Sequence, residues 1–140
     1  MLIDELKKAN IQAMKDRDNV KRGVLSIVLT KYKLEEVEAK AKGKDYGDSD
    51  LLAIIQKTLK ELNDEKEGYL KANNATKAKE ISLQEETIKA YLPQQLSEDE
   101  IKAEIAKLDD KSIPNVMKYF KANFAGKVDM SKVSAIARTL

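Results

Sequence analysis

Apolar residues recur every three or four positions along most of the chain, which is the spacing of one face of an α-helix. In the N-terminal two thirds this spacing is interrupted at residues that end or cap helices, such as Gly43 and the pair Asn73 and Asn74. Asp18 or Asn19 is expected to cap the second helix, and Asp48 or Ser49 the third. The pattern predicts four helices, over residues 2–16, 18–43, 48–73 and 76–91. The third and fourth are expected to form a long antiparallel hairpin across a short turn.

The inward face of the second helix is predicted from its apolar spacing. The residues expected on this face are Val20, Val24, Ile27 and Leu34, with Leu25, Val28, Leu29 and Tyr32 beside them. These positions follow the helical period, so the segment is expected to bury one side against its neighbours.

The C-terminal third begins at Pro93, since the residue before a proline is disfavoured in a helix. Ser97 and Glu100 then form a capping-box pattern, in which each side chain bonds the backbone N–H of the other residue. Three short helices are predicted here, following Ser97, Ser112 and Asp129, with Leu140 facing inward at the end of the last. The sequence thus predicts an all-α fold, with an N-terminal four-helix domain (1–93) that contains a long helical hairpin and a small C-terminal three-helix domain (94–140).

Composition narrows the chemistry available to this fold. The 140 residues include no Cys and no His, so thiolate nucleophiles, thiolate metal sites and the usual general base near neutral pH are missing. Adjacent acids such as Glu35 and Glu36 point to different helix faces and form no paired site by spacing alone. Neither a phosphate-binding nor a dinucleotide-binding glycine loop is present. We therefore expect no catalytic residue, no cofactor and no metal.

The N-terminus carries two acids, Asp4 and Glu5, where a secretory signal would carry bases. The longest nearly apolar run, Gly23 to Leu29, is far shorter than the ~20 residues that span a bilayer. These features predict a cytoplasmic protein with no membrane partner.

Charge is distributed unevenly although the formal net charge is only +2. Residues 97–110 contain six acids and two lysines, a local net of −4, whereas residues 111–140 contain six bases and one acid, a local net of +5. This asymmetry has two interpretations: ordinary helix decoration that follows the helix dipole, or a basic surface that binds phosphate. The candidate nucleic-acid-binding residues are Lys118, Lys121, Lys127, Lys132 and Arg138.

The aromatic residues and the last helix refine the second interpretation. Lys118 and Lys121 share a helix face with Tyr119 nearby, whereas Phe120 and Phe124 are expected to lie in the core. Lys127 and Lys132 surround the N-terminus of the last helix, where backbone N–H groups attract phosphate.

The run from Tyr91 to Ile101, YLPQQLSEDEI, resembles the YLP-x-QLS-x-x-E-[IL] signature of YqeY-like proteins. These are small bacterial proteins related to the tail domain of the B subunit of glutamine-dependent aspartyl/glutamyl-tRNA amidotransferase. Further similarities are Glu80-Ile81 before this run, the apolar segment Val24–Leu29, the NVMK segment at 115–118 and the turn GKVD at 126–129. The resemblance covers nearly the whole chain.

Three positions depart from the family pattern. Pro114-Asn115 stands where the family has a glycine before its Val-Met pair, and Met130-Ser131 where it has a glycine after the aspartate. Lys127 replaces an arginine, and a lysine binds phosphate as a point charge without the bidentate geometry of arginine.

The resemblance implies a two-part helical fold and a link to tRNA, because the amidotransferase tail helps to hold tRNA while other domains perform the chemistry. It implies no catalytic residue. The resulting hypothesis is an accessory module that binds tRNA or assists a larger tRNA-modifying enzyme, a carbon–nitrogen ligase that uses glutamine as amide donor. The alternative is a protein-interaction module that docks on a larger enzyme through the charged hairpin around Leu62 to Tyr69, without contacting nucleic acid.

Overall fold

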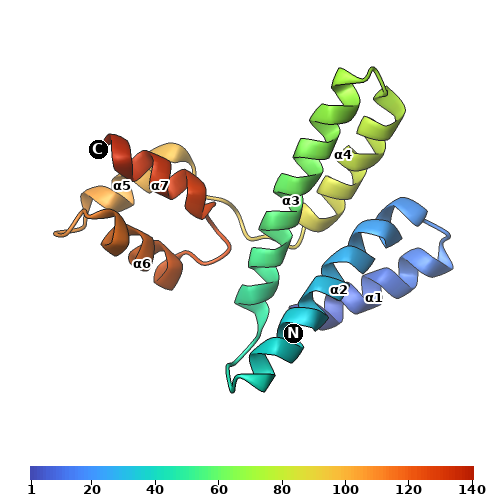
Figure 1. Cartoon of the computed structure of the whole chain (residues 1–140), viewed down its shortest axis with the longest axis horizontal. Helices are drawn as coiled ribbons and strands as arrows, with labels where there is room; N and C mark the ends of the chain where they lie inside the picture. The colour runs from blue at the N-terminus through green and yellow to red at the C-terminus, as the bar shows by residue number, and fades with distance from the viewer. The chain divides into compact units, whose positions relative to one another are not determined.

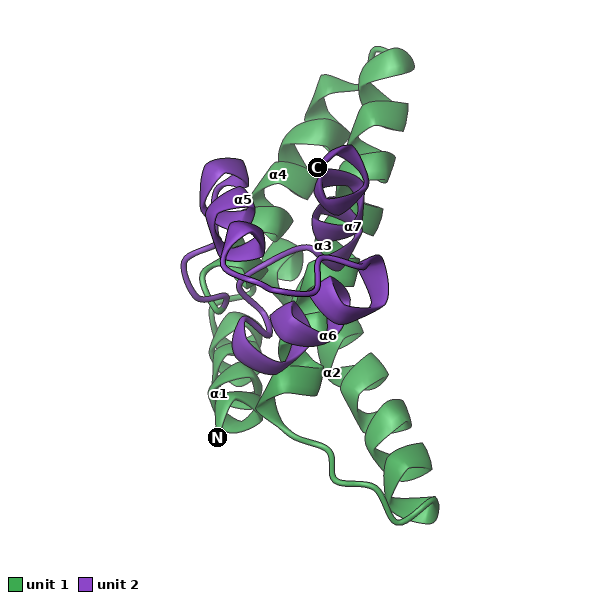
Figure 2. Ribbon diagram, turned by 90° about the vertical axis from the view of Figure 1, so that its left-hand side faces the viewer, with its two compact units in different colours: residues 1–91 green, residues 92–140 purple.

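The computed structural model describes all 140 residues, which form seven α-helices and no β-strand (Figure 1). The chain divides into two compact units, unit 1 (Met1–Tyr91) and unit 2 (Leu92–Leu140), which Figure 2 distinguishes by colour. The prediction of an all-α chain with four helices followed by three is confirmed. Unit 1 contains α1 (Leu2–Lys15), α2 (Asn19–Ala41), α3 (Asp48–Lys71) and α4 (Ala75–Lys89). Unit 2 contains α5 (Glu98–Ala106), α6 (Ile113–Asn123) and α7 (Met130–Thr139).

Short polar side chains define the helix ends of unit 1. The Asp18 carboxylate accepts the N–H of Lys21 at 3.1 Å at the start of α2, and the Asn74 side chain caps α4 in the same way. Asn73 has a φ of 58°, the left-handed conformation that the sequence predicts for it. The expected cap of α3 is wrong, since Gly47 holds that position. The carboxylate of Asp50 reaches back to accept the Gly47 N–H at 2.9 Å, which places Asp48 and Ser49 inside the first turn.

The core of unit 1 forms around α2, which packs against α1, α3 and α4. The buried residues of α2 are Val24, Leu25, Val28 and Tyr32. The predicted face is therefore wrong in part, because Ile27 is 45% exposed and Leu34 is 64% exposed. The exposed residues Ile27 and Leu34 and the buried residues Leu25 and Tyr32 form two apolar stripes, and both stripes have helical spacing. The three partner helices cover the side that carries Leu25 and Tyr32.

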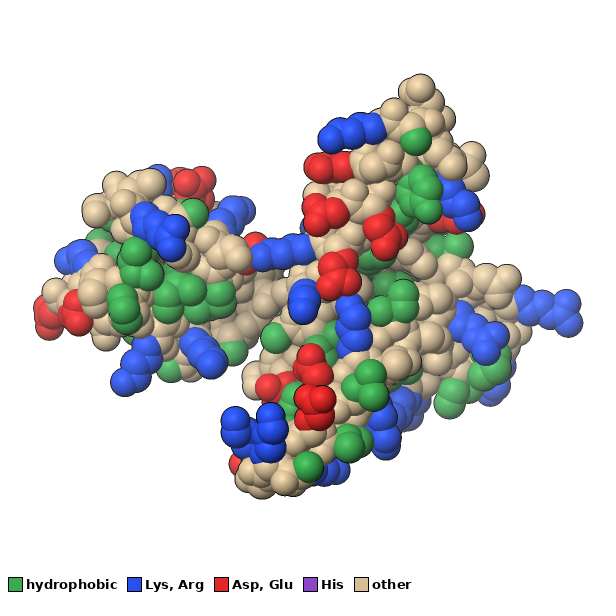
Figure 3. All heavy atoms as spheres, in the orientation of Figure 1, with side chains coloured by type: hydrophobic (Ala, Val, Ile, Leu, Met, Phe, Trp, Pro, Cys, Tyr) green, Lys and Arg blue, Asp and Glu red, His purple; other side chains and the backbone are tan.

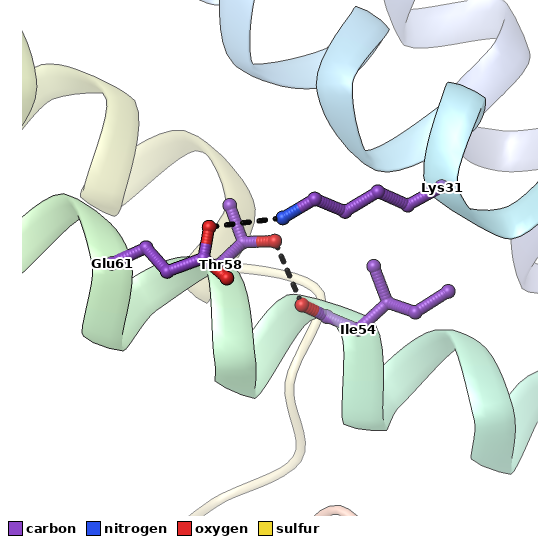
Figure 4. A network of polar contacts seen from close by, with 4 residues as sticks. All are labelled: Lys31, Ile54, Thr58 and Glu61. Atoms are coloured by element: carbon purple, nitrogen blue, oxygen red, sulfur yellow. Dashed lines mark hydrogen bonds and ion pairs between the residues drawn. The ribbon is translucent and has the colours of Figure 1, made fainter.

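Helices α3 and α4 form the predicted antiparallel hairpin, in which α4 lies beside the C-terminal part of the longer α3 (Figure 1). The Lys66 ammonium lies 2.6 Å from the Glu85 carboxylate across this hairpin, with both side chains about three-quarters or more buried. Toward the other end of α3, the buried hydroxyl of Thr58 donates to the Ile54 carbonyl at 2.8 Å. Next to it, the Lys31 ammonium of α2 lies 3.1 Å from the Glu61 carboxylate of α3 (Figure 4). Because the Lys31–Glu61 pair is partly exposed it contributes at most about 1 kcal/mol, and apolar burial dominates the α2–α3 contact.

Unit 2 has its own core, centred on Phe120, which is fully buried. Ser97 and Glu100 form the predicted capping box at the start of α5, with reciprocal bonds of 3.1 and 3.2 Å. The expectation that Leu140 faces inward is wrong: this residue lies beyond the end of α7 and is 65% exposed. The buried residues of this core are Ile101, Ile105, Val116, Phe120, Val128, Val133, Ile136 and Ala137.

Two leucines of α2 test which side of this helix is buried. We expect Leu25→Ala to lower the free energy of unfolding by about 2–5 kcal/mol, because Leu25 is 1% exposed and its truncation leaves a cavity. Leu34→Ala is the matched control, and we expect a change within about 0.5 kcal/mol. Urea unfolding followed by circular dichroism measures both. Equal losses of unfolding free energy in the two variants would show that the side of α2 that carries Leu34 is also buried.

We further propose that residues 1–93 and 94–140 are separate domains, with residues 1–93 able to fold alone. Every core residue of unit 1 lies between Ile3 and Ile88, so removing residues 94–140 takes no side chain from this core. We expect the 1–93 fragment to unfold cooperatively on heating, as measured by circular dichroism at 222 nm. A fragment without a cooperative transition would contradict the proposed boundary.

Candidate nucleic-acid interface

The five candidate residues all lie in unit 2 and all have exposed side chains. Lys118 and Lys121 belong to α6, Lys127 lies in the turn between α6 and α7, and Lys132 and Arg138 belong to α7. None of the five forms an ion pair with an acid of the chain, so their charges are available to an external anion.

Helix geometry separates these cations into smaller groups. Lys118 and Lys121 are three residues apart and lie on one side of α6. Lys132 and Arg138 are six residues apart, so they project from α7 in directions about 120° apart. Figure 3 shows Lys and Arg side chains spaced around the visible face of unit 2, with hydrophobic side chains between them. The arrangement suits several separated phosphates better than one compact anion.

The turn that carries Lys127 is held in place from a distant part of the chain. Gly126 is buried and has a φ of 77°, a conformation that favours glycine. The side-chain amide of Gln95 donates to the Gly126 carbonyl at 2.7 Å, and the Leu96 N–H donates to the Lys127 carbonyl at 2.8 Å. The segment that carries the family-like signature therefore fixes the backbone beside Lys127. Gln95 was not identified as a candidate from sequence, although it lies within that signature.

The N-terminus of α7 is less open to phosphate than the sequence suggests. Asp129 accepts the N–H of Ser131 with its carboxylate at 2.9 Å and the N–H groups of Lys132 and Val133 with its carbonyl. These bonds occupy most of the N–H groups that an anion would use, and the carboxylate repels phosphate. At this helix end an external phosphate would meet few free N–H groups, and the cations offered to it are the side chains of Lys127 and Lys132.

Tyr119 belongs to the rim of the core. Its hydroxyl donates to the Glu104 carboxylate at 2.8 Å, and its ring packs edge-on against Phe120 with centroids 5.5 Å apart. The Lys107 ammonium lies 3.0 Å from the same carboxylate. The hydrogen bonds from Lys107 and Tyr119 lower the pKa of Glu104, and the bond to Glu104 raises the pKa of Tyr119. The link between Glu104 and Tyr119 spans 15 residues, and no local pattern in the sequence indicates it.

Most acids of unit 2 are bound inside the unit, in contrast to the five cations, and only Asp99 and Asp109 have no such bond. Glu98 pairs with Lys102, Glu100 bonds the Ser97 N–H, and Glu104 binds Lys107 and Tyr119. The Asp110 carboxylate accepts the Ser112 N–H at 3.0 Å, which lowers the pKa of Asp110. Unit 2 thus offers its surroundings more positive than negative charge.

The acidic side chains of the whole chain are dispersed over its helices and turns. No group of three or more His, Cys, Asp or Glu side chains is arranged to hold a metal ion. None of the seven helices combines the length and apolar character needed to cross a bilayer.

Comparison with known proteins gives one assignment. The family model described as Yqey-like protein matches residues 3–140. No curated protein matches the chain.

The Glu104 cluster generates a prediction on pH. Because folding lowers the pKa of Glu104, its ionised form stabilises the native state above the ordinary carboxyl pKa near 4.5, and this contribution is lost as pH falls through the folded pKa. Glu104→Gln should therefore reduce the melting temperature at pH 7 and have a smaller effect at pH 3. Lys102→Gln, which removes an exposed i,i+4 pair, is the control. A loss at pH 3 as large as at pH 7 would contradict the assigned role of the charge.

Proposed function

The chain belongs to the YqeY-like family, and on this premise we propose that it is a non-catalytic accessory module that binds tRNA through the basic surface of unit 2. The residues assigned to this basic surface are Lys118, Lys121, Lys127, Lys132 and Arg138. In this proposal the module holds the tRNA for a larger tRNA-modifying enzyme, and that enzyme supplies the amide-transfer chemistry.

The observation that carries the proposal is the different use of the two kinds of charge in unit 2. Most of its acids are bound to helix N-termini and to neighbouring side chains, whereas the five cations have no ion-pair partner in the chain. Free lysines and arginines that bind phosphate release counterions from the nucleic acid, and this release favours association at moderate salt. The separated arrangement of the cations supports contacts to backbone phosphates rather than the reading of bases.

The Lys127 turn supports the same proposal. The bonds from Gln95 and Leu96 restrict the backbone of this turn before any ligand binds. A cation on a fixed turn loses less conformational entropy on binding than one on a mobile loop. The clamp therefore suits Lys127 as an anchor for one phosphate.

A second candidate function is docking on a larger enzyme through the tip of the α3–α4 hairpin. Tyr69 and Leu70 are 37% and 53% exposed there, so two adjacent large side chains offer apolar surface to a partner. Leu62, at the other end of the segment named above, is buried in the core and is unavailable to a partner. A stoichiometric protein partner that resists nuclease in a native pull-down would favour this candidate.

Binding to tRNA is tested by titrating labelled bulk tRNA with the protein at two salt concentrations, with duplex DNA as competitor. Four or five phosphate contacts should give a log–log salt slope of roughly −3 to −4.5. We expect the triple variant Lys118→Glu, Lys121→Glu, Lys127→Glu to lose at least about tenfold in affinity at low salt and to show a shallower slope.

The matched control reverses three exposed lysines of unit 1, Lys33, Lys71 and Lys79, to glutamate. This control changes the net charge by the same amount, so it should keep nearly all of the affinity if the basic surface of unit 2 is the site. Equal losses of affinity in both triple variants would show that binding depends only on the net charge of the protein and would contradict the proposed site. Displacement of tRNA by equimolar DNA would contradict a tRNA-specific role.

A further inference from the structure

Unit 1 contains an open groove of about 540 Å³ that the proposed tRNA surface does not use. It lies between α1 and α4, with the N-terminal part of α2 beneath it. The volume falls within the range of sites that bind ligands or peptide side chains. The lining residues needed for the argument are Ala9, Ala13, Leu25, Leu83 and Tyr91, with Asp16, Asp18 and Glu86 among the charged ones.

The groove exists because α1 and α4 both pack on α2 but make little contact with each other. Helix α4 approaches α2 at Gly23, where an added Cβ would lie only 3.2 Å from the side-chain nitrogen of Gln84. That nitrogen donates to the Val20 carbonyl at 3.2 Å. The contact fixes α4 along one edge of α2, and the space toward α1 stays open.

Each wall of the groove is a helical face without a partner. On α1 and its C-cap the lining positions are 9, 12, 13 and 16, and on α4 and its C-cap they are 83, 86, 87 and 90. Both sets follow the spacing i, i+3, i+4, i+7, which is the spacing of a face that packs against another helix. Small side chains on both walls, Ala9 and Ala13 on one and Thr87 and Ala90 on the other, allow close approach of a helix backbone.

The chemistry of the groove selects a particular kind of helix. Its floor is apolar at Leu25 and Ala13, and Leu83 on the α4 wall is 45% exposed, so burial of this leucine would favour docking. Three carboxylates and one ammonium, that of Lys21, border this apolar surface. The bases Lys15, Arg17 and Arg22 belong to the same helix junction but are not part of the lining.

We propose that this groove docks an amphipathic helix of a partner protein, with an apolar stripe over Leu83 and Ala9 and with Lys or Arg beside that stripe. The basic residues pair with Asp16 and Glu86, which border the apolar surface, while the Asp18 carboxylate beside them also caps α2. The excess of carboxylates disfavours nucleic acid as the occupant. The groove is thus a protein-docking site in unit 1, separate from the basic surface of unit 2.

The probe for this site is a labelled synthetic helix of about 15 residues with leucines at i, i+3, i+4 and i+7 and lysines on the flanks. A second probe replaces the lysines with glutamates. Fluorescence anisotropy with the full-length protein at physiological salt should show saturable binding of the lysine peptide. The glutamate peptide should bind at least about tenfold more weakly, because like charges then face the rim. Absence of saturable binding, or equal binding of both peptides, would overturn the proposal.

Two leucine variants locate the binding. Leu83→Ser should weaken the lysine peptide about fivefold or more, because it removes apolar surface that docking buries. Leu34→Ser is the matched control, since Leu34 is an exposed leucine of α2 that lies outside the groove, and it should leave the affinity unchanged. Equal losses in both variants would overturn the assignment to the groove.

Two further measurements distinguish a partner helix from a second copy of this chain and from tRNA. In analytical ultracentrifugation we expect the protein alone to show no self-association through the groove. Self-association that Leu83→Ser abolishes would assign the groove to a second copy of the chain and would overturn the proposed partner helix. Leu83→Ser should keep the affinity for tRNA, because the basic surface lies in unit 2. If the wild-type protein does not bind tRNA, the peptide titration still tests the groove. The two proposals can therefore be contradicted separately.

Discussion

Burial of one side of α2 is the interaction on which unit 1 depends, since the other three helices of the unit all pack on it. A single helix that serves three partners must be buried over a wide side, here the one that carries Val24, Leu25 and Tyr32. The partners are not equivalent, however. α1 and α4 have 14 and 15 residues against 23 in α2, and they occupy different edges of it. The same packing that stabilises the unit therefore leaves a groove between two of its helices and an exposed apolar stripe on the outside of α2.

Capping requirements explain the charge of unit 2. Its three helices have 9, 11 and 10 residues, so a large share of their backbone N–H groups lies in first turns. Glu100, Asp110 and Asp129 satisfy N–H groups at or just before these helix starts, and their charges are thereby used within the unit. Cations on the outer surfaces of α6 and α7 have no comparable partner. A positive exterior thus follows from the way short helices are ended, although the formal net charge of the whole chain is only +2.

Local signals in the sequence were sufficient for most helix ends, because Asp18, Asn74 and Ser97 each act within three residues of themselves. The buried side of α2 was only partly predictable, since two apolar stripes with the same period compete and only the position of the partner helices decides between them. The assignment of Phe120 to the core was right, and that of Tyr119 to the lysine surface missed its bond to Glu104, a residue on another helix. The groove could not be predicted at all, because it depends on how α1 and α4 are spaced across α2.

The bonds from Gln95 to Gly126 and from Leu96 to Lys127 also have a consequence for the folding of unit 2. Unit 1 is built from hairpins of consecutive helices, α1 with α2 and α3 with α4, whose contacts form early because little chain entropy is lost in making them. In unit 2 the bond from Gln95 to Gly126 closes a loop over a separation of 31 residues, and it can form only when α5 and α6 have brought the chain back to its starting point. We therefore expect the long-range bonds of Gln95 and Leu96 to form late, so that substitution of Gln95 alters the unfolding rate more than the folding rate.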